Sequence, residues 1–115
     1  MTIKFVNCTP HIVSVKAIGG NIVEFPPSGN VIRVHSCSVG LPDLESEGGN
    51  VFSLTKNTFG IPSGIPEPEE GVLYIVSAIV LANSDRIDLV RPDTGPTAVR
   101  ANGQIQYVMG FCQDL

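Results

Sequence analysis

Glycine and proline recur along this whole chain, and they set the strongest limit on its fold. Twelve glycines and nine prolines are spread over the 115 residues and do not gather in one linker. Glycine loosens the backbone, and proline removes an amide donor and fixes φ, so long regular elements are interrupted. The pattern therefore predicts short strands joined by turns. The length predicts a single domain, 1–115.

The apolar composition predicts a packed core built mainly from strands. Apolar residues make up 43% of the chain and charged residues only 16%, which argues against disorder. Tryptophan is absent, so the core is aliphatic, led by Val, Ile and Leu with five Phe. No long segment shows a 3.6-residue period. We therefore expect a mainly β fold of the α+β class, with one short helix and a small antiparallel or mixed sheet.

Turn residues divide the chain into candidate strands. The run at 72–76 is continuously apolar, which is typical of a strand buried on both faces. The segment 41–50 is too polar to be buried, and the three prolines of 61–71 predict a stiff, extended surface segment. Strands are expected at 2–6, 11–17, 21–25, 31–39, 51–54, 72–76, 86–90, 97–101 and 104–112.

Local signals also predict how some of these elements connect. The first half is expected to be an antiparallel meander, with 2–6 and 11–17 forming a hairpin. Residues 78–83 either extend the preceding strand or form a short helix, and Ser77 as a plausible N-cap favours the helix. Asn102-Gly103 is the clearest signal, because this dipeptide suits a type I′ turn and predicts a C-terminal β-hairpin. In its second strand, the alternating Ile105, Tyr107, Met109 and Phe111 are expected to face the core.

Charge and cysteine usage narrow the partners and the compartment. The net charge is −4, and the acidity lies in the middle: 1–40 carries +2, 41–71 carries −5 and 72–115 carries −1. Duplex nucleic acid needs clustered Lys and Arg, so it is not an expected partner. The N-terminus lacks a signal-peptide pattern, and the most apolar stretch is about half of what a bilayer span needs. Three cysteines without framework spacing indicate reduced thiols, and we expect a cytoplasmic protein.

Catalytic and metal chemistry find little support in the residues. Cys8, His11, His35 and Cys37 come nearest to a zinc site, but the spacing in each half is irregular. No nucleophile elbow or nucleotide-binding glycine loop occurs. We therefore expect no catalytic residue, no metal and no cofactor.

Three arginines are the better candidates for binding chemistry. Arg86, Arg91 and Arg100 lie outside the acidic middle, and the Arg fork binds phosphate through two parallel hydrogen bonds. The alternative is ordinary ion pairing with Asp88 and Asp93. His11, Tyr74 or Phe59 could stack on a base.

Three segments resemble a family of small, uncharacterised proteins from phages and prophages. They are VNCTPHIV at 6–13, PEPEEGVLYIVS at 66–77 and RIDLVRPDTG at 86–95. Members of the family begin with an Asn-x-Thr-Pro-His turn and carry a Pro-Glu-x-x-x-Gly-x-x-Tyr-Ile-Val-Ser run. The matching residues here are Asn7, Thr9, Pro10, His11, Pro66, Glu67, Tyr74, Ile75, Val76, Ser77, Arg86, Asp88, Leu89 and Pro92.

This resemblance implies a role inside an infected host cell. It suggests a sponge, a protein that binds and sequesters a nucleotide-derived immune signal of bacterial defence without cleaving it. The alternatives are a virion accessory or a binder of a host protein and, less favoured, a small hydrolase. A small sheet with few edge lysines also predicts a homo-oligomer. The expected ligand-binding residues are His11, Ser77, Arg86, Asp88, Arg91 and Arg100.

Overall fold

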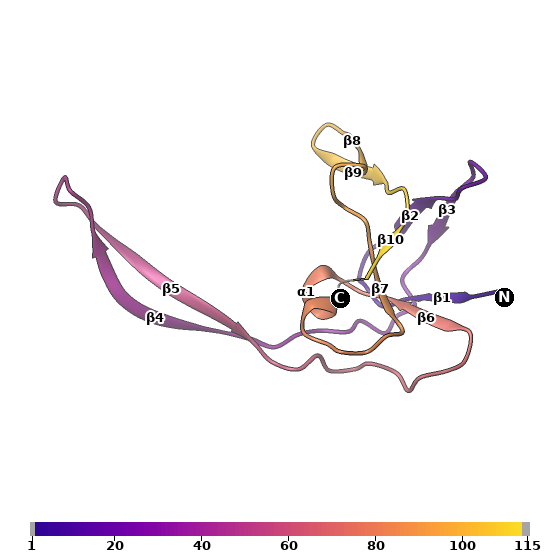
Figure 1. Cartoon of the computed structure of the whole chain (residues 1–115), viewed down its shortest axis with the longest axis horizontal. Helices are drawn as coiled ribbons and strands as arrows, with labels where there is room; N and C mark the ends of the chain where they lie inside the picture. The colour runs from indigo at the N-terminus through magenta and orange to yellow at the C-terminus, as the bar shows by residue number, and fades with distance from the viewer. Residues whose placement is uncertain (1, 114–115) are drawn as a thin grey trace.

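The computed structural model describes residues 2–113, and its architecture is mainly β (Figure 1). Among the described residues, 46% are strand and 4% are helix, in one short helix, which confirms the predicted fold class. The elements are β1 Lys4–Asn7, β2 Val13–Lys16, β3 Ile22–Phe25, β4 Ser36–Glu45, β5 Val51–Phe59, β6 Val72–Ile75, α1 Ala78–Ala82, β7 Leu89–Pro92, β8 Val99–Ala101, β9 Gln104–Tyr107 and β10 Phe111–Cys112.

We call the part of the molecule outside residues 36–59 the body. A mixed four-stranded sheet in the order β1-β6-β7-β10 forms its centre. Strand β6 pairs in parallel with both β1 and β7, and β10 runs antiparallel to β7. The interior position of β6 explains its continuous apolar run, since both of its faces meet a core. Val72 and Tyr74 point into one cluster, and Ile75 points into the other. The prediction of a strand buried on both faces is confirmed.

The predicted hairpin between 2–6 and 11–17 is wrong. Strand β1 instead pairs with β6, with Lys4 opposite Val72, and β2 forms a separate ribbon with β3. The turn after Asn7 redirects the chain out of the central sheet, so β2 leaves the plane in which β1 lies (Figure 1). The buried β6 needs a neighbour on each side, and β1 supplies one of them.

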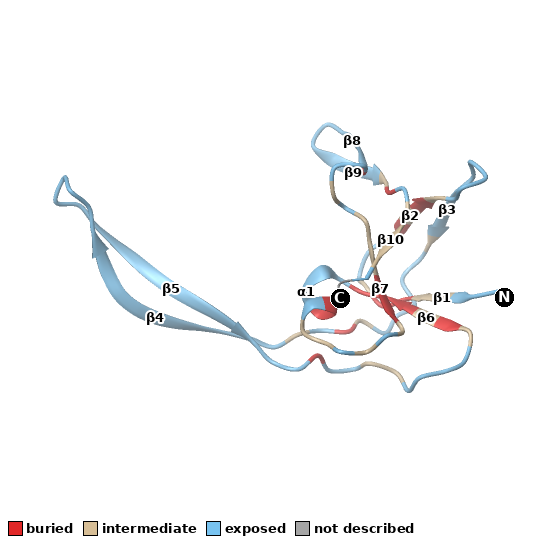
Figure 2. Ribbon diagram, viewed as in Figure 1, coloured by how far each residue is buried: buried red, intermediate tan, exposed pale blue. Residues whose placement is uncertain are grey.

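Two apolar clusters cover the two faces of the central sheet. One contains α1 with Val80 and Leu81 and also Leu89, and the other contains Val15 of β2 together with Val108. Phe5, Phe25 and Phe111 pack beside the second cluster, with ring centroids 4.9 to 5.9 Å apart. Figure 2 shows that the buried residues lie in the body.

Helix α1 begins and ends where the sequence predicts. The Ser77 hydroxyl accepts a hydrogen bond from the amide of Val80 at 3.4 Å, and Asn83 is the C-cap. The helix alternative for 78–83 is therefore correct, and the strand alternative is wrong.

The most prominent feature is a long hairpin, β4–β5, which we call the arm (Figure 1). Every residue from 36 to 59 is exposed. The arm extends the molecule to 60 Å and gives a radius of gyration of 18.0 Å, against about 13 Å for a compact domain of this length.

The arm corrects three sequence expectations. Strand β4 lies further along the chain than the predicted 31–39, half of the predicted loop 41–50 is strand, and β5 runs on to Phe59 instead of ending at 54. A register shift between Leu41 and Leu44 accommodates Pro42, which would otherwise break a regular ladder. Polarity alone therefore misled the prediction, because a strand that leaves the body need not be buried.

The C-terminal hairpin β8–β9 turns at Asn102 and Gly103, as predicted. Both have positive φ, 54° and 78°, as a type I′ turn requires. The predicted core face of its second strand is correct only in part: Tyr107 is half-buried and Phe111 packs beside the second cluster, but Ile105 and Met109 are exposed and Val108 is buried instead. The backbone of Val108 pairs with β2, which turns its side chain inward.

The strand predicted at 86–90 is shifted to Leu89–Pro92. Arg86 and Asp88 precede it and bind each other, and Ile87 between them is exposed. The proline-rich 61–71 contributes one isolated bridge, Ser63 to Arg33, and no strand.

Candidate functional site

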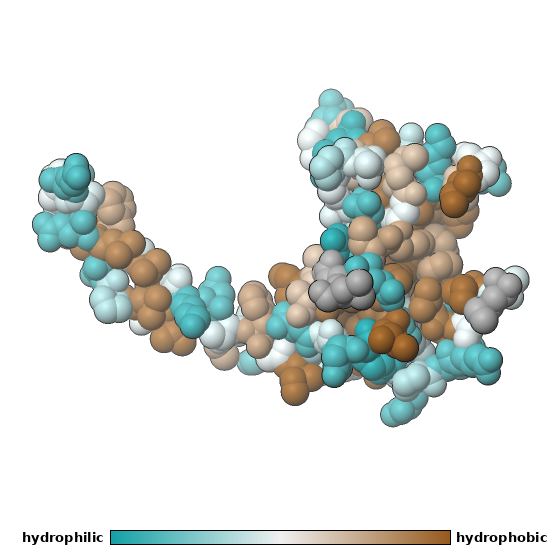
Figure 3. All heavy atoms as spheres, viewed as in Figure 1, coloured by the Kyte–Doolittle hydropathy of each residue, from teal (hydrophilic) through white to brown (hydrophobic). Residues whose placement is uncertain are grey.

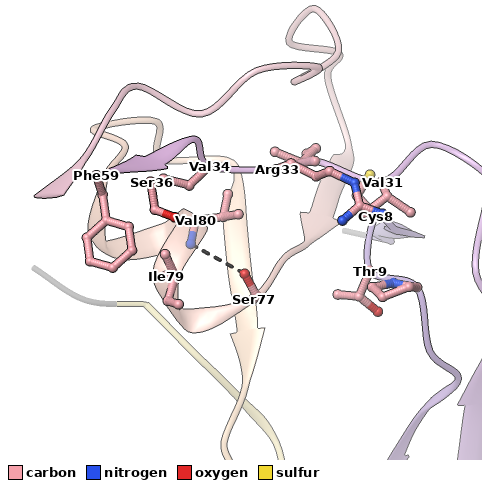
Figure 4. Close-up of a pocket in the computed structure, with 12 residues that line it drawn as sticks. Cys8, Thr9, Val31, Arg33, Val34, Ser36, Phe59, Ser77, Ile79 and Val80 are labelled. Carbon is pink, nitrogen blue, oxygen red and sulfur yellow. Dashed lines mark hydrogen bonds between the residues drawn. The ribbon is translucent and has the colours of Figure 1, made fainter. Parts of the chain in front are cut away.

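A cavity of about 300 Å³ lies where the arm leaves the body (Figure 4). The turn after β1, the segment before β4, the end of β5 and the start of α1 all contribute to it. Its lining residues are Cys8, Thr9, Pro10, Val31, Ile32, Arg33, Val34, Ser36, Phe59, Ser77, Ile79 and Val80.

The lining of this cavity has a positive bias within an acidic protein. Arg33 brings one cation, and none of the lining residues, all of which the structure describes, is acidic. The backbone of Arg33 is held by two hydrogen bonds with Ser63, at 2.9 and 3.3 Å, while its side chain is exposed. Hydroxyl groups of Thr9, Ser36 and Ser77 also line the cavity. Such a set suits an anionic ligand that carries hydroxyl groups.

The opposite end of the cavity is apolar. Phe59 and Ile79 lie there, 45% and 51% exposed, and Figure 4 shows them away from Arg33. An exposed aromatic ring beside an aliphatic side chain can hold a planar group by stacking. The cavity therefore offers a flat apolar region at one end and a cation at the other.

Cys8 also lines the cavity, but it is not an activated nucleophile. Its side chain is buried, and burial raises the pKa of the thiol, with a hydrogen bond to Ser28 acting in the opposite direction. The thiol therefore stays protonated at neutral pH.

Two of the predicted binding residues, Arg86 and Asp88, are brought together as an ion pair. The Arg86 guanidinium donates to both Asp88 carboxylate oxygens, at 2.8 and 2.6 Å, and to the carbonyl of Pro66 at 3.0 Å. This pairing lowers the pKa of Asp88 and raises that of Arg86. The Tyr74 hydroxyl donates a hydrogen bond to the carbonyl of Glu67, and burial raises the pKa of this hydroxyl. These groups hold the proline-rich segment against the sheet.

The other predicted residues are dispersed. Arg100 is exposed and donates to the carbonyls of Thr94 and Gly95, at 2.7 and 3.4 Å. Arg91 lies in β7 and donates to the carbonyl of Pro92 at 3.4 Å. His11 lines a different cavity, of about 290 Å³, between β2 and β9. Of the predicted ligand set, Ser77 alone lines the cavity at the base of the arm.

The sequence analysis named Phe59 as a stacking residue but missed Arg33. Arg33 stands alone between Ile32 and Val34 in the sequence, without a motif. Its place in the same cavity as α1 and Phe59 depends on how the arm joins the body. The one usable signal was its position in the basic part of the chain, ahead of the acidic middle.

The Asn-x-Thr-Pro-His turn has a structural explanation. The buried Asn7 side chain donates to the carbonyls of His11 and Phe25, at 2.7 and 2.8 Å. It also accepts hydrogen bonds from the amide and hydroxyl of Thr9, at 3.0 and 2.7 Å. Asn7 thereby joins the end of β1 to β3 and closes the turn. The imidazole of His11 is not part of this network, since only the backbone of that residue is used.

The described residues contain no group of three or more His, Cys, Asp or Glu side chains placed to hold a metal ion. Cys8 is buried in the body, whereas Cys37 is exposed on the arm. Within 2–113, no helix has the length and apolar character needed to cross a membrane. Neither the models of known protein families, nor the curated proteins, nor the solved structures contain a match to this chain.

Proposed function

We propose that this protein binds and sequesters a small phosphorylated, nucleotide-derived ligand in the cavity at the base of the arm. The observation that carries the proposal is that Arg33 and several hydroxyl side chains line the same cavity, and that this lining contains no acidic residue although the net charge of the chain is −4. The volume of about 300 Å³ lies at the small end of ligand pockets and suits a nucleotide-sized group.

Each end of the cavity has its own role in this proposal. The Arg33 fork binds phosphate oxygens, and Phe59 stacks on the base. The hydroxyls of Thr9 and Ser36 hydrogen-bond ribose or phosphate oxygens, and Ser77 contributes beside its capping contact. The Arg86–Asp88 pair acts indirectly, by holding the segment that supports the sheet.

The protein works by stoichiometric binding and leaves the ligand intact. The one thiol in the cavity, Cys8, is held protonated by burial. A sponge that counters a bacterial defence signal in the host cytoplasm fits this chemistry, as the resemblance to phage proteins implies.

The test is calorimetry of the purified protein against cyclic dinucleotides and cyclic ADP-ribose species. Arg33→Ala should weaken binding about 10- to 100-fold, the effect of one lost charge-assisted contact. Arg100→Ala is the matched control: it removes an exposed arginine outside the cavity and should leave affinity unchanged. Chromatography after heat release should return the ligand intact. Recovery of a cleaved product would make the protein an enzyme, and an absence of binding across the panel would reject the proposal.

A protein-interaction role is the second candidate, and the exposed apolar side chains of the arm favour it. An arm that leaves the body in this way is suited to contact another protein chain.

A further inference from the structure

The arm has one apolar face and one polar face. The β4–β5 register places Val39 opposite Lys56, Leu41 opposite Leu54 and Leu44 opposite Phe52. Because side chains alternate along strands, these residues share one face. Ser38, Asn57 and Thr55 lie on the other, where the Ser38 hydroxyl donates to Asn57 at 2.7 Å. We call the first the apolar arm face, made of Val39, Leu41, Leu44, Phe52 and Leu54.

Nothing within residues 2–113 covers the apolar arm face. Its five side chains are 37% to 56% exposed, and Figure 3 shows hydrophobic residues following the arm away from the body. A two-stranded ribbon is marginally stable alone in water, and it gains stability when an apolar face is packed. Five apolar side chains lie together on this face with Lys56 at its body end, whereas the other face carries mainly polar residues together with Val51 and Phe59. So many exposed apolar side chains on one face indicate a surface that a partner covers.

We propose that the apolar arm face packs against the same face of a second copy of this chain, with the two arms antiparallel about a two-fold axis. This inference is independent of the proposed nucleotide ligand. It extends the expectation of a homo-oligomer by assigning the contact surface and its direction. A two-fold contact is self-complementary, so one amphipathic face serves both partners.

The charges of the arm favour this direction. Within 36–59, every residue of which is described, the one cation is Lys56, which lies at the body end of the apolar arm face. The acids Asp43, Glu45 and Glu47 lie toward the tip. Antiparallel arms bring Lys56 of each copy toward the acidic tip of the other, whereas parallel arms bring like charges together.

The area of the apolar arm face sets the expected strength of the dimer. Five side chains about half exposed offer about 400 Å² of apolar surface per copy, or about 800 Å² for two before flanking atoms are counted. Specific interfaces bury at least about 1,000 Å², so flanking backbone and polar atoms of the arms must add to the contact, and we expect micromolar dissociation constants.

Sedimentation velocity and light scattering from about 1 to 200 μM test the contact. Wild-type protein should shift from monomer to dimer over this range. Leu54→Asp places a charge on the apolar arm face and should raise the dimer Kd more than tenfold. Thr55→Asp is the matched control, since it places the same charge one residue along β5 on the polar face, and it should dimerise like wild type. At concentrations below the dimer Kd, thermal unfolding of each variant should match wild type, because the arm lies outside both cores.

Charge exchange tests the direction of the arms. Two variants are compared: one carries Lys56→Glu, and the other carries both Glu45→Lys and Glu47→Lys. Each variant by itself should form a weaker dimer, because like charges then meet. Mixing the two variants should restore dimerisation at least to the wild-type level, because each arm then meets an opposite charge.

Three results would overturn the proposal. The first is that the wild-type protein remains monomeric at 200 μM, whether or not its arm binds a different protein. The second is equal dimerisation of Leu54→Asp and Thr55→Asp. The third is a failure of the mixed charge variants to recover, which would reject the antiparallel arrangement. Nucleotide binding is measured separately by calorimetry, so a failure of the dimer proposal can be distinguished from a failure of the proposed function.

Discussion

Replacement of Asn7 by alanine should strongly destabilise the fold, although Asn7 lies at the end of a short strand. Its side chain makes four hydrogen bonds and is 3% exposed. The truncation leaves the carbonyl of Phe25 and the amide of Thr9 without this partner in a partly buried turn. At about 1 kcal/mol per net hydrogen bond, we expect a loss of about 3–4 kcal/mol in the free energy of unfolding. Such a loss is a large part of the 5–15 kcal/mol typical of a domain.

Asn7→Asp separates the roles of the amide donors and the acceptor oxygen. The carboxylate can still accept from Thr9, but it turns an oxygen toward the carbonyls of His11 and Phe25. At pH 7 this variant should be at least as unstable as Asn7→Ala. The surroundings favour the protonated form, so the native pKa of the new carboxyl lies above its unfolded value. Stability should therefore recover as the pH falls through the native pKa.

Urea unfolding followed by far-ultraviolet circular dichroism measures both effects, since the chain has no tryptophan to report by fluorescence. Asn57→Ala is the control: this exposed residue of the arm has one side-chain contact, to Ser38, and its loss should cost less than about 1 kcal/mol. A cost below about 1 kcal/mol for Asn7→Ala, or a stability of Asn7→Asp that falls further below that of wild type on acidification, would refute the reasoning.

Three further substitutions test the rest of the body by the same unfolding measurement. Asp88→Asn weakens the pair with Arg86 and should cost about 1–2 kcal/mol at pH 7. The lowered pKa of Asp88 means that this difference should shrink below about pH 4 and vanish once the pH passes under the native pKa. Gly103→Ala forces a side chain to φ 78° beside Asn102 and should cost about 1–2 kcal/mol. Tyr74→Phe removes a buried donor to a carbonyl and should cost about 1 kcal/mol.

Those features that depend on near neighbours in the chain could be predicted from the sequence. The continuous apolar run of β6 required a strand covered on both faces, whichever strands became its neighbours. Ser77 could cap a helix because the amide it accepts from is only three residues away. Asn102 and Gly103 tolerate positive φ, so they select their turn without help from distant residues.

Features that depend on distant partners were decided by the tertiary structure. Strand β1 could have formed a hairpin with β2, its neighbour in sequence, but it pairs with the distant β6 and encloses that apolar strand. The alternation in the last hairpin is visible in the sequence, but backbone pairing of Val108 with β2 buries that side chain and leaves Ile105 and Met109 exposed. Arg86 and Asp88 satisfy each other, which local pattern alone could not distinguish from a free phosphate-binding arginine.

The arm and the cavity show the same division most clearly. The alternation of Phe52 and Leu54 with Ser53 and Thr55 is visible in the sequence and places both apolar side chains on one face of the arm. That this face projects away from both cores depends on how the two strand ends join the body. Arg33 and Phe59 line one cavity for the same reason, because the ladder of the arm brings its first and last residues together beside α1. Local chemistry thus determined each strand, turn and cap, and long-range pairing decided which side chains share a site.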